Sequence, residues 1–186
     1  MPFFRSALYI STIFGLIYLI ALVFLNSINL SLSDLVNWVF RIIIILAIIF
    51  SVIGYRTRYA KKGMRFFSAF GLGMLTSFFL AIYMVISAFI FYDFVAPDYN
   101  TKFEDYYKKR RSEQMYDSIL KKRKEEFSET YKMTPEDSLI VEKGLAKHLK
   151  GTHFFFTTNG AASINFIFCL VWGVGISISV AFMARK

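Results

Sequence analysis

Four apolar stretches, each long enough to cross a lipid bilayer as a helix, constrain this chain more than any other feature. They cover approximately residues 7–25, 36–55, 66–92 and 161–183. The hydrocarbon core of a bilayer is about 30 Å thick, and a helix needs roughly 20 apolar residues to cross it. Hydrophobic residues make up 56% of the chain, which is typical of membrane proteins and too high for a soluble domain. The sequence therefore predicts an all-α membrane protein with four transmembrane helices.

The distribution of Lys and Arg between the short loops predicts the orientation of these spans. Residues 56–65 carry five basic residues and no acid, whereas residues 26–37 carry no Lys or Arg. Short loops rich in Lys and Arg stay in the cytoplasm. We therefore expect loop 56–65 and both termini to be cytoplasmic, and Arg5, Arg185 and Lys186 agree with this orientation. The expected location is a bacterial cytoplasmic (inner) membrane, with a multi-pass, N-in/C-in chain.

Residues 93–151 form the one long polar loop. They hold 13 of the 22 basic and 12 of the 13 acidic residues. The predicted organisation is therefore residues 1–92 with spans one to three, a charged periplasmic loop at 93–151, and residues 152–186 with span four and a cytoplasmic tail. The net charge of +9 comes mainly from the flanks of the spans. Such charges suit anionic lipid, and no nucleic-acid partner is expected.

Two helices are predicted within the polar loop. Residues 102–131 contain no Gly or Pro and read as one long helix. Thr134 can cap the next helix, Pro135 suits its first position, and Glu136 and Asp137 favour its positive end. This second helix is expected to run to about Lys150. The result is a helical hairpin between spans three and four.

The basic run in the first of these helices has two interpretations. Runs of charge are most often a solvated helix with paired opposite charges. The alternative is an edge that docks a partner protein, with the aromatic and basic residues Tyr107, Lys108, Lys109, Arg110 and Arg111. A lipid surface is a third candidate for the same charges.

Small residues recur at every fourth position in the last two spans and predict close helix contacts. They are Ala69, Gly73, Ser77 and Ala81 in one span and Asn165, Cys169, Gly173, Ser177 and Ala181 in the other. Residues four apart share a helix face, and small ones allow two backbones to approach closely in lipid. Packing within the bundle is the first interpretation, and a seam for a homo-oligomer or another membrane protein is the second.

Groups that could carry chemistry are few. Arg41 is the one charged residue within a span, near the outer end of the second span. It either reaches lipid phosphates or pairs with Asp93 or Asp34 in a polar cluster that Asn165 could join. No carboxylate lies near mid-membrane to carry protons. The single cysteine and the spacing of His148 and His153 match no metal motif. We therefore predict a protein that is not an enzyme and that has no metal or cofactor.

The order of several short motifs resembles a known family. The motifs are YRTR at 55–58, FSAFGLG at 67–73 and FVAPDY at 94–99, followed by the charged helical segment and the Gly-rich final span. Together they resemble the small four-span inner-membrane proteins, mainly from Bacteroidetes, that are filed as domain of unknown function 4199. The resemblance implies a bacterial cytoplasmic membrane and suggests a role in envelope or glycoconjugate biogenesis. It implies no active-site residues.

The absence of reaction groups and the presence of packing stripes favour one function. We expect a non-enzymatic accessory or scaffold subunit that docks a membrane-protein partner through the periplasmic helical loop and its small-residue helix faces. A component of a transporter or flippase for a small solute or a lipid-linked molecule is the alternative, because Arg41 and polar residues on several spans could line a path.

Overall fold

The computed structural model describes residues 2–28, 34–60 and 63–184. It divides into two compact units, which we call the membrane unit (Met1–Pro97 with Thr158–Lys186) and the loop unit (Asp98–Thr157). The described residues form helices and no strands. The predicted all-α class is confirmed.

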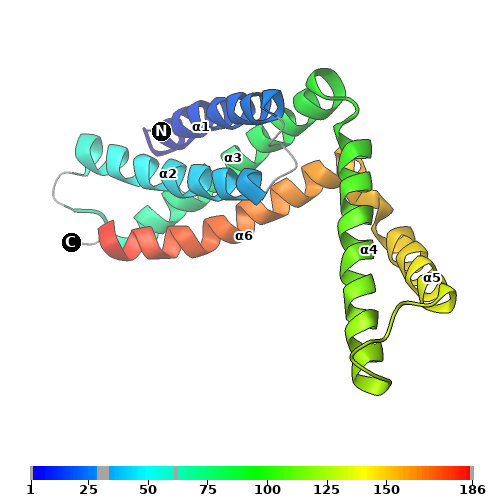
Figure 1. The fold of residues 1–186 in the computed structure, drawn as a ribbon. Helices are drawn as coiled ribbons and strands as arrows, with labels where there is room; N and C mark the ends of the chain where they lie inside the picture. Colours follow the sequence, from blue (N-terminus) through cyan, green and yellow to red (C-terminus); the bar gives the residue numbers. More distant parts are fainter. Residues whose placement is uncertain (1, 29–33, 61–62, 185–186) are drawn as a thin grey trace. The chain divides into compact units, whose positions relative to one another are not determined.

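The membrane unit contains four helices that are long and apolar enough to cross a bilayer. They are α1 (Pro2–Ser27), α2 (Asp34–Tyr59), α3 (Phe66–Phe89) and α6 (Thr158–Ala184). Figure 1 shows them running side by side. The four predicted spans are confirmed, and α1, α2 and α6 extend a few residues beyond their apolar stretches.

The third span is longer than its apolar stretch indicated. After Phe89 the chain continues as a short π-helix, Ile90–Val95. It ends at Ala96, which has a non-helical backbone (φ −139°, ψ 68°). A residue before proline is pushed out of the helical region, so Pro97 explains the end of the helix.

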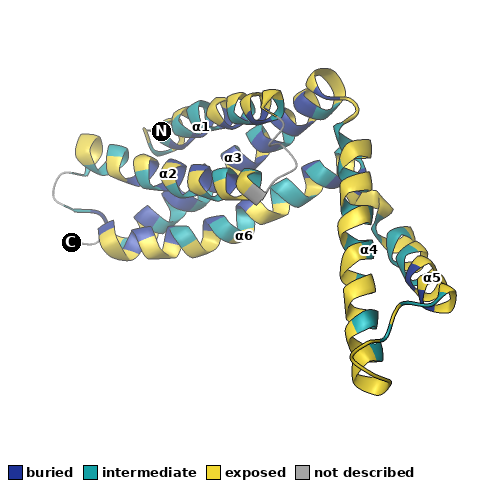
Figure 2. Cartoon of the chain, viewed as in Figure 1, coloured by how far each residue is buried: buried dark blue, intermediate teal, exposed yellow. Residues whose placement is uncertain are grey.

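Helix α3 is the centre of the membrane unit. In its most apolar window 44% of residues are buried, against 28–33% in the other three spans, and Figure 2 shows the buried faces turned toward the inside of the unit. Hydroxyl groups also connect α3 to its neighbours. The Ser11 hydroxyl donates to the backbone oxygen of Thr76 (2.9 Å), and the Thr76 hydroxyl donates to the Ser51 hydroxyl (2.8 Å). These bonds link α1, α3 and α2 in a setting without water to compete for them.

The first span begins and the last span ends at the same end of the membrane unit, as expected for a chain that crosses a bilayer an even number of times. The start of α1, the end of α2, the start of α3 and the end of α6 lie at one end of the membrane unit (Figure 1). Arg5, Arg56, Arg58 and Arg65 belong to these ends. Of the other basic residues used to predict the orientation, Lys61, Lys62, Arg185 and Lys186 lie outside the described residues.

The loop unit consists of α4 (Tyr99–Glu126), α5 (Pro135–Thr152) and one turn of 3-10 helix, His153–Phe156. The start of α5 is confirmed: Thr134 is the N-cap, Pro135 occupies the first turn, and Asp137 completes a capping box. The predicted end of the preceding helix is wrong. Helix α4 ends at Glu126 instead of continuing to Tyr131, because residues after Glu126 turn back toward Asp137.

Candidate functional site

The two stripes of small residues meet along α3 and α6. Their centre is reciprocal: Gly73 faces Ser177, and Gly173 faces Ser77. A Cβ atom added to Gly73 would lie 2.8 Å from the Ser177 Cβ, and one added to Gly173 would lie 2.5 Å from the Ser77 Cβ. Non-bonded carbon atoms normally stay about 3.5 Å apart or more. The two helices therefore approach to a distance that only glycine allows at these positions.

Most of the remaining stripe residues lie in the same contact. Ala69, Ala81 and Ala181 are fully buried, and the Cys169 thiol points to the backbone oxygen of Ser77 at 3.5 Å. Asn165 differs, because its amide donates to the Tyr18 hydroxyl on α1 (3.4 Å). The structure thus places the stripes at a contact within the chain, the first of the two interpretations.

The three polar residues expected in or near the membrane do not form one cluster. Arg41 on α2 lies between two indole rings, with its guanidinium carbon 5.2 Å from the ring centres of both Trp38 and Trp172. Asp93 instead accepts a hydrogen bond from the Thr158 hydroxyl at 3.0 Å. Asn165 contacts Tyr18, as described above. The suggested pairing of Arg41 with Asp34 falls on a side chain outside the described part of the chain.

The predicted docking edge on α4 is divided between two faces. Tyr107 is half-buried inside the loop unit, where its hydroxyl hydrogen-bonds His148 Nε2 (2.9 Å) and its ring packs against Phe156. Arg111 is also half-buried and donates to Gln114. Lys109 and Arg110 are exposed. Only part of the expected edge is therefore accessible from outside the loop unit.

Ion pairs along α4 explain how so charged a helix remains stable. The Lys108 ammonium lies 3.0 Å from Glu104 and 3.6 Å from Asp105. Its hydrogen bond to Glu104, supported by the negative charge of both acids, raises the Lys108 pKa above its ordinary value. Asp98 and Lys102 form a similar pair one turn earlier. Oppositely charged residues four apart each contribute a few tenths of a kcal/mol to a helix.

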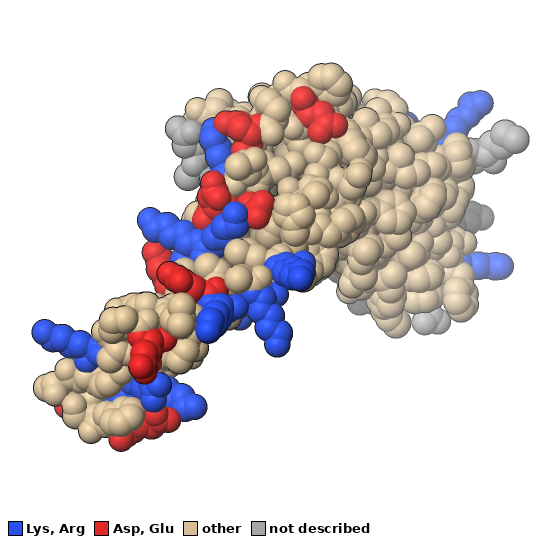
Figure 3. All heavy atoms as spheres, turned by 90° about the vertical axis from the view of Figure 1, so that its right-hand side faces the viewer, with Lys and Arg blue, Asp and Glu red and all other residues tan. Residues whose placement is uncertain are grey.

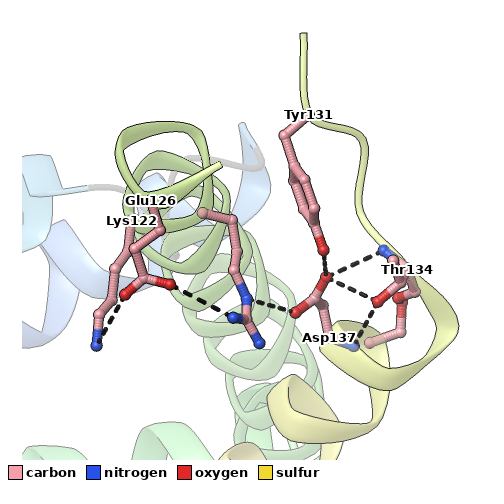
Figure 4. Close-up of polar contacts among 7 residues, drawn as sticks. Lys122, Glu126, Tyr131, Thr134 and Asp137 are labelled. Carbon is pink, nitrogen blue, oxygen red and sulfur yellow. Dashed lines mark hydrogen bonds and ion pairs between the residues drawn. The ribbon is translucent and has the colours of Figure 1, made fainter. Parts of the chain in front are cut away.

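Asp137 is a buried acid whose importance the sequence did not reveal. Its side chain is 1% exposed and accepts hydrogen bonds from the Tyr131 hydroxyl (2.6 Å), the Thr134 backbone N–H (3.1 Å) and Arg123 Nε (3.0 Å) (Figure 4). The Tyr131 bond, with those from Thr134 and Arg123, holds the Asp137 pKa well below its usual range. The same contact raises the Tyr131 pKa. The sequence predicted Thr134 as a helix cap, but it did not predict the contacts of Asp137 with Tyr131 and Arg123.

The loop unit buries very little. Of its residues, all of which the structure describes, Asp137, Val141 and Phe156 are buried, and α4 buries no side chain. Several large apolar groups are exposed instead: Tyr106, Tyr116, Phe127, Leu139 and Ile140. Figure 3 shows acidic and basic side chains interspersed over this unit, whereas the visible flank of the membrane unit is almost uncharged. The loop unit therefore offers an outer surface that is both charged and aromatic.

Exposed aromatic and basic residues share one side of α4. Tyr106, Lys109, Arg110, Glu113 and Tyr116 are all exposed. Their spacings of three, four, seven and ten residues from Tyr106 place them on one helix face. We call these five residues the outer face of α4.

The described ranges contain no group of three His, Cys, Asp or Glu side chains that could hold a metal ion. In the membrane unit, the Ser11, Thr76 and Ser77 hydroxyls donate hydrogen bonds to another hydroxyl or to backbone oxygens.

Comparison with known proteins gives a family but no characterised relative. No curated protein and no solved structure matches the chain. The model of the family described as "Protein of unknown function (DUF4199)" matches residues 7–186, nearly the whole chain, and this agrees with the resemblance noted from the motifs. The chain therefore belongs to the DUF4199 family.

Proposed function

We propose that this protein is a non-enzymatic accessory or scaffold subunit of a membrane complex and that it docks a partner protein through the loop unit. One observation carries the proposal: α4 has 28 residues and buries none of them. A helix that is polar on all sides depends on its own ion pairs or on contact with another molecule. The ion pairs of α4 explain its solubility, but they do not explain its exposed aromatic residues.

The outer face of α4 is the proposed contact surface. It combines two tyrosines, Tyr106 and Tyr116, with the cations Lys109 and Arg110. Tyrosine and arginine are enriched among the residues that contribute most of the binding energy at protein interfaces. A partner with an acidic surface would match the two cations, and tyrosine rings would supply apolar contact area. Of the edge predicted at 107–111, only Lys109 and Arg110 belong to this surface, which also includes Tyr106, Glu113 and Tyr116.

The proposed location is the inner membrane of a bacterium, with both termini in the cytoplasm and the loop unit in the periplasm. The bases at the ends of α1, α2 and α3 support this orientation. Reporter fusions at Lys62, Asp117 and Lys186 test it. Alkaline phosphatase should be active only at Asp117, and activity at the other two positions would reverse the orientation.

A charge-reversal pair tests the docking surface in the full chain. Lys109→Glu with Arg110→Glu should remove the partner from affinity purifications under mild detergent, because both cations lie on the outer face. The control, Lys147→Glu with Lys150→Glu, makes the same change in charge at exposed positions of α5 and should retain the partner. Replacing residues 105–130 with a Gly/Ser linker should also abolish binding. Partner recovery at the parental yield from both the outer-face and linker variants would refute docking through the loop unit.

Arg41 supports a second candidate, a component of a transporter or flippase for a lipid-linked molecule. It is a cation held within a span, and such residues commonly mark substrate paths. A protein that purifies without a stoichiometric partner but moves a lipid between leaflets would favour this candidate.

A further inference from the structure

Two indole rings lie beside the Arg41 guanidinium, and no described residue accepts a hydrogen bond from its N–H groups. The indoles of Trp38 and Trp172 lie at equal distances of 5.2 Å from its guanidinium carbon. A guanidinium carries five N–H donors, all in its plane. Among the described residues, no hydrogen bond or ion pair satisfies these donors. The cation thus has aromatic contacts but no hydrogen-bond acceptor among the described residues.

Helix geometry gives the depth of this cation in the membrane. The hydrogen bond between the Ser51 and Thr76 side chains shows that these two residues of α2 and α3 lie at about the same depth. Thr76 lies ten residues after the start of α3, and Arg41 lies ten residues before Ser51, so each segment spans about 15 Å along its helix. The Arg41 backbone therefore lies about 30 Å from the level of Phe66, which is the thickness of the hydrocarbon core.

This depth places the guanidinium among lipid headgroups. Arg65 directly precedes the start of α3, and the level of this helix start is taken as one membrane boundary. Arg41 then lies at the opposite boundary. Side chains lean toward the start of their own helix, so Arg41 on α2 leans outward from the hydrocarbon. Tryptophan is also enriched at this level of a bilayer.

The surface around the cation suits an amphipathic ligand. Trp38 is 59% exposed, and exposed apolar residues continue from it along α2 at helical spacing, namely Leu35, Ile42, Leu46 and Ile53. An acyl chain could lie along this stripe while its headgroup meets Arg41. Arginine recognises phosphate through two parallel N–H donors, and Arg41 carries such donors without an acceptor among the described residues.

We propose that Arg41, Trp38 and Trp172 form a binding site for the phosphate group of an anionic membrane lipid, in the leaflet opposite loop 56–65. The two rings orient the guanidinium, and the lipid phosphate supplies the acceptor that the described protein groups do not. This site is independent of docking through the loop unit, because its residues all belong to the membrane unit.

The chain contains only two tryptophans, so its tryptophan fluorescence reports on this site alone. The full chain would be reconstituted in nanodiscs of an unlabelled zwitterionic lipid. Phosphatidylglycerol with brominated acyl chains, which quench nearby indoles, would then be titrated in and compared with brominated phosphatidylcholine. The parent should be quenched at a lower fraction of the anionic lipid, by about fivefold, the usual effect of one cation near an anionic surface.

Matched variants isolate the role of Arg41. Arg41→Gln should remove the preference for the anionic lipid, and Arg41→Lys should restore part of it, since an ammonium keeps the charge but not the paired donors. Arg58→Gln removes the same charge at an exposed position at the other end of α2 and should leave the preference unchanged. Circular dichroism would verify that the helical content of each variant equals that of the parent.

Three results would overturn the proposal. The first is equal quenching of the parent by both lipids, and the second is an unchanged preference in a folded Arg41→Gln variant. The third concerns the source of the phosphate: relief of the quenching by millimolar inorganic phosphate would assign the site to a soluble anion. If Arg41→Gln does not fold, Arg41→Lys provides the test: it keeps the charge but loses the paired N–H donors, so an unchanged preference in the folded Arg41→Lys variant would overturn the proposal.

Discussion

Replacing Gly173 with alanine should destabilise the membrane unit through one added methyl group. The new Cβ would lie 2.5 Å from the Cβ of Ser77. That atom is fixed to the α3 backbone, so no rotamer change can move it away. The clash must be relieved by separating α3 from α6, which would also loosen the contact of Gly73 with Ser177.

The magnitude follows from the cost of overpacking a close contact. Extra methyl or methylene groups in a well-packed core typically cost about 1–3 kcal/mol, and lost contacts along the separated helices act in the same direction. Gly175→Ala is the matched control, two residues away on α6. A Cβ there meets no atom within 4 Å, and alanine favours a helix over glycine by up to about 1 kcal/mol. The two substitutions should therefore change stability in opposite directions.

The assay is thermal unfolding of the purified variants in one detergent, followed by circular dichroism, with monodispersity measured by size-exclusion chromatography. Gly173→Ala should lower the midpoint and Gly175→Ala should leave it unchanged or raise it. Adding Ser77→Gly to Gly173→Ala should recover much of the loss, because it removes the atom that the methyl group meets. A Gly173→Ala protein as stable as the parent would refute the close contact between α3 and α6. A double variant that recovers none of the lost stability would refute it as well.

Two further predictions concern buried polar groups. The Ser177 hydroxyl is buried with no hydrogen-bond partner among the described residues, so Ser177→Ala should raise the unfolding free energy by about 1 kcal/mol in the same thermal assay; a loss of stability would show that the hydroxyl has a partner. The pKa of Asp137 in the folded protein is below the unfolded value of about 3.9. The Asp137 carboxylate therefore stabilises the loop unit above about pH 4. This stabilisation is lost as the pH falls toward the folded pKa. Hydrogen exchange of residues 127–145 should accordingly lose protection between pH 5 and pH 3 in the parent but change much less in Asp137→Asn, and equal losses in both proteins would contradict this assignment.

The sequence predicted those features that depend on local composition. Each of the four spans is a long apolar stretch. Comparing the length of this stretch as a helix with the thickness of the bilayer is sufficient to identify the span. The sequence signal for the start of α5 was equally local, because Thr134 and Asp137 are three residues apart and Pro135 lies between them. Such signals need no knowledge of the rest of the fold.

The features that the sequence missed depend on contacts between distant residues. The preference of residues 127–131 for a helix is outweighed by the Tyr131 and Arg123 bonds to buried Asp137. Likewise, the spacing of Trp38 and Arg41 indicates that they are neighbours on α2, but nothing local brings Trp172 to the same guanidinium. The inward turn of Tyr107 toward His148 has the same cause, because it requires α5 to pack against α4.

The arrangement of polar groups in the membrane unit favours a scaffold over a conducting path. A path for a solute needs polar side chains that face a common opening across the bilayer. Here the Ser11, Ser51 and Thr76 hydroxyls are consumed by bonds that join α1, α2 and α3. At Gly73 and Gly173, α3 and α6 approach too closely to leave an opening between them. The cation at Arg41 lies instead beside an exposed apolar stripe of α2. The proposed lipid site at this position needs no path across the bilayer, and it is therefore compatible with the proposed scaffold role.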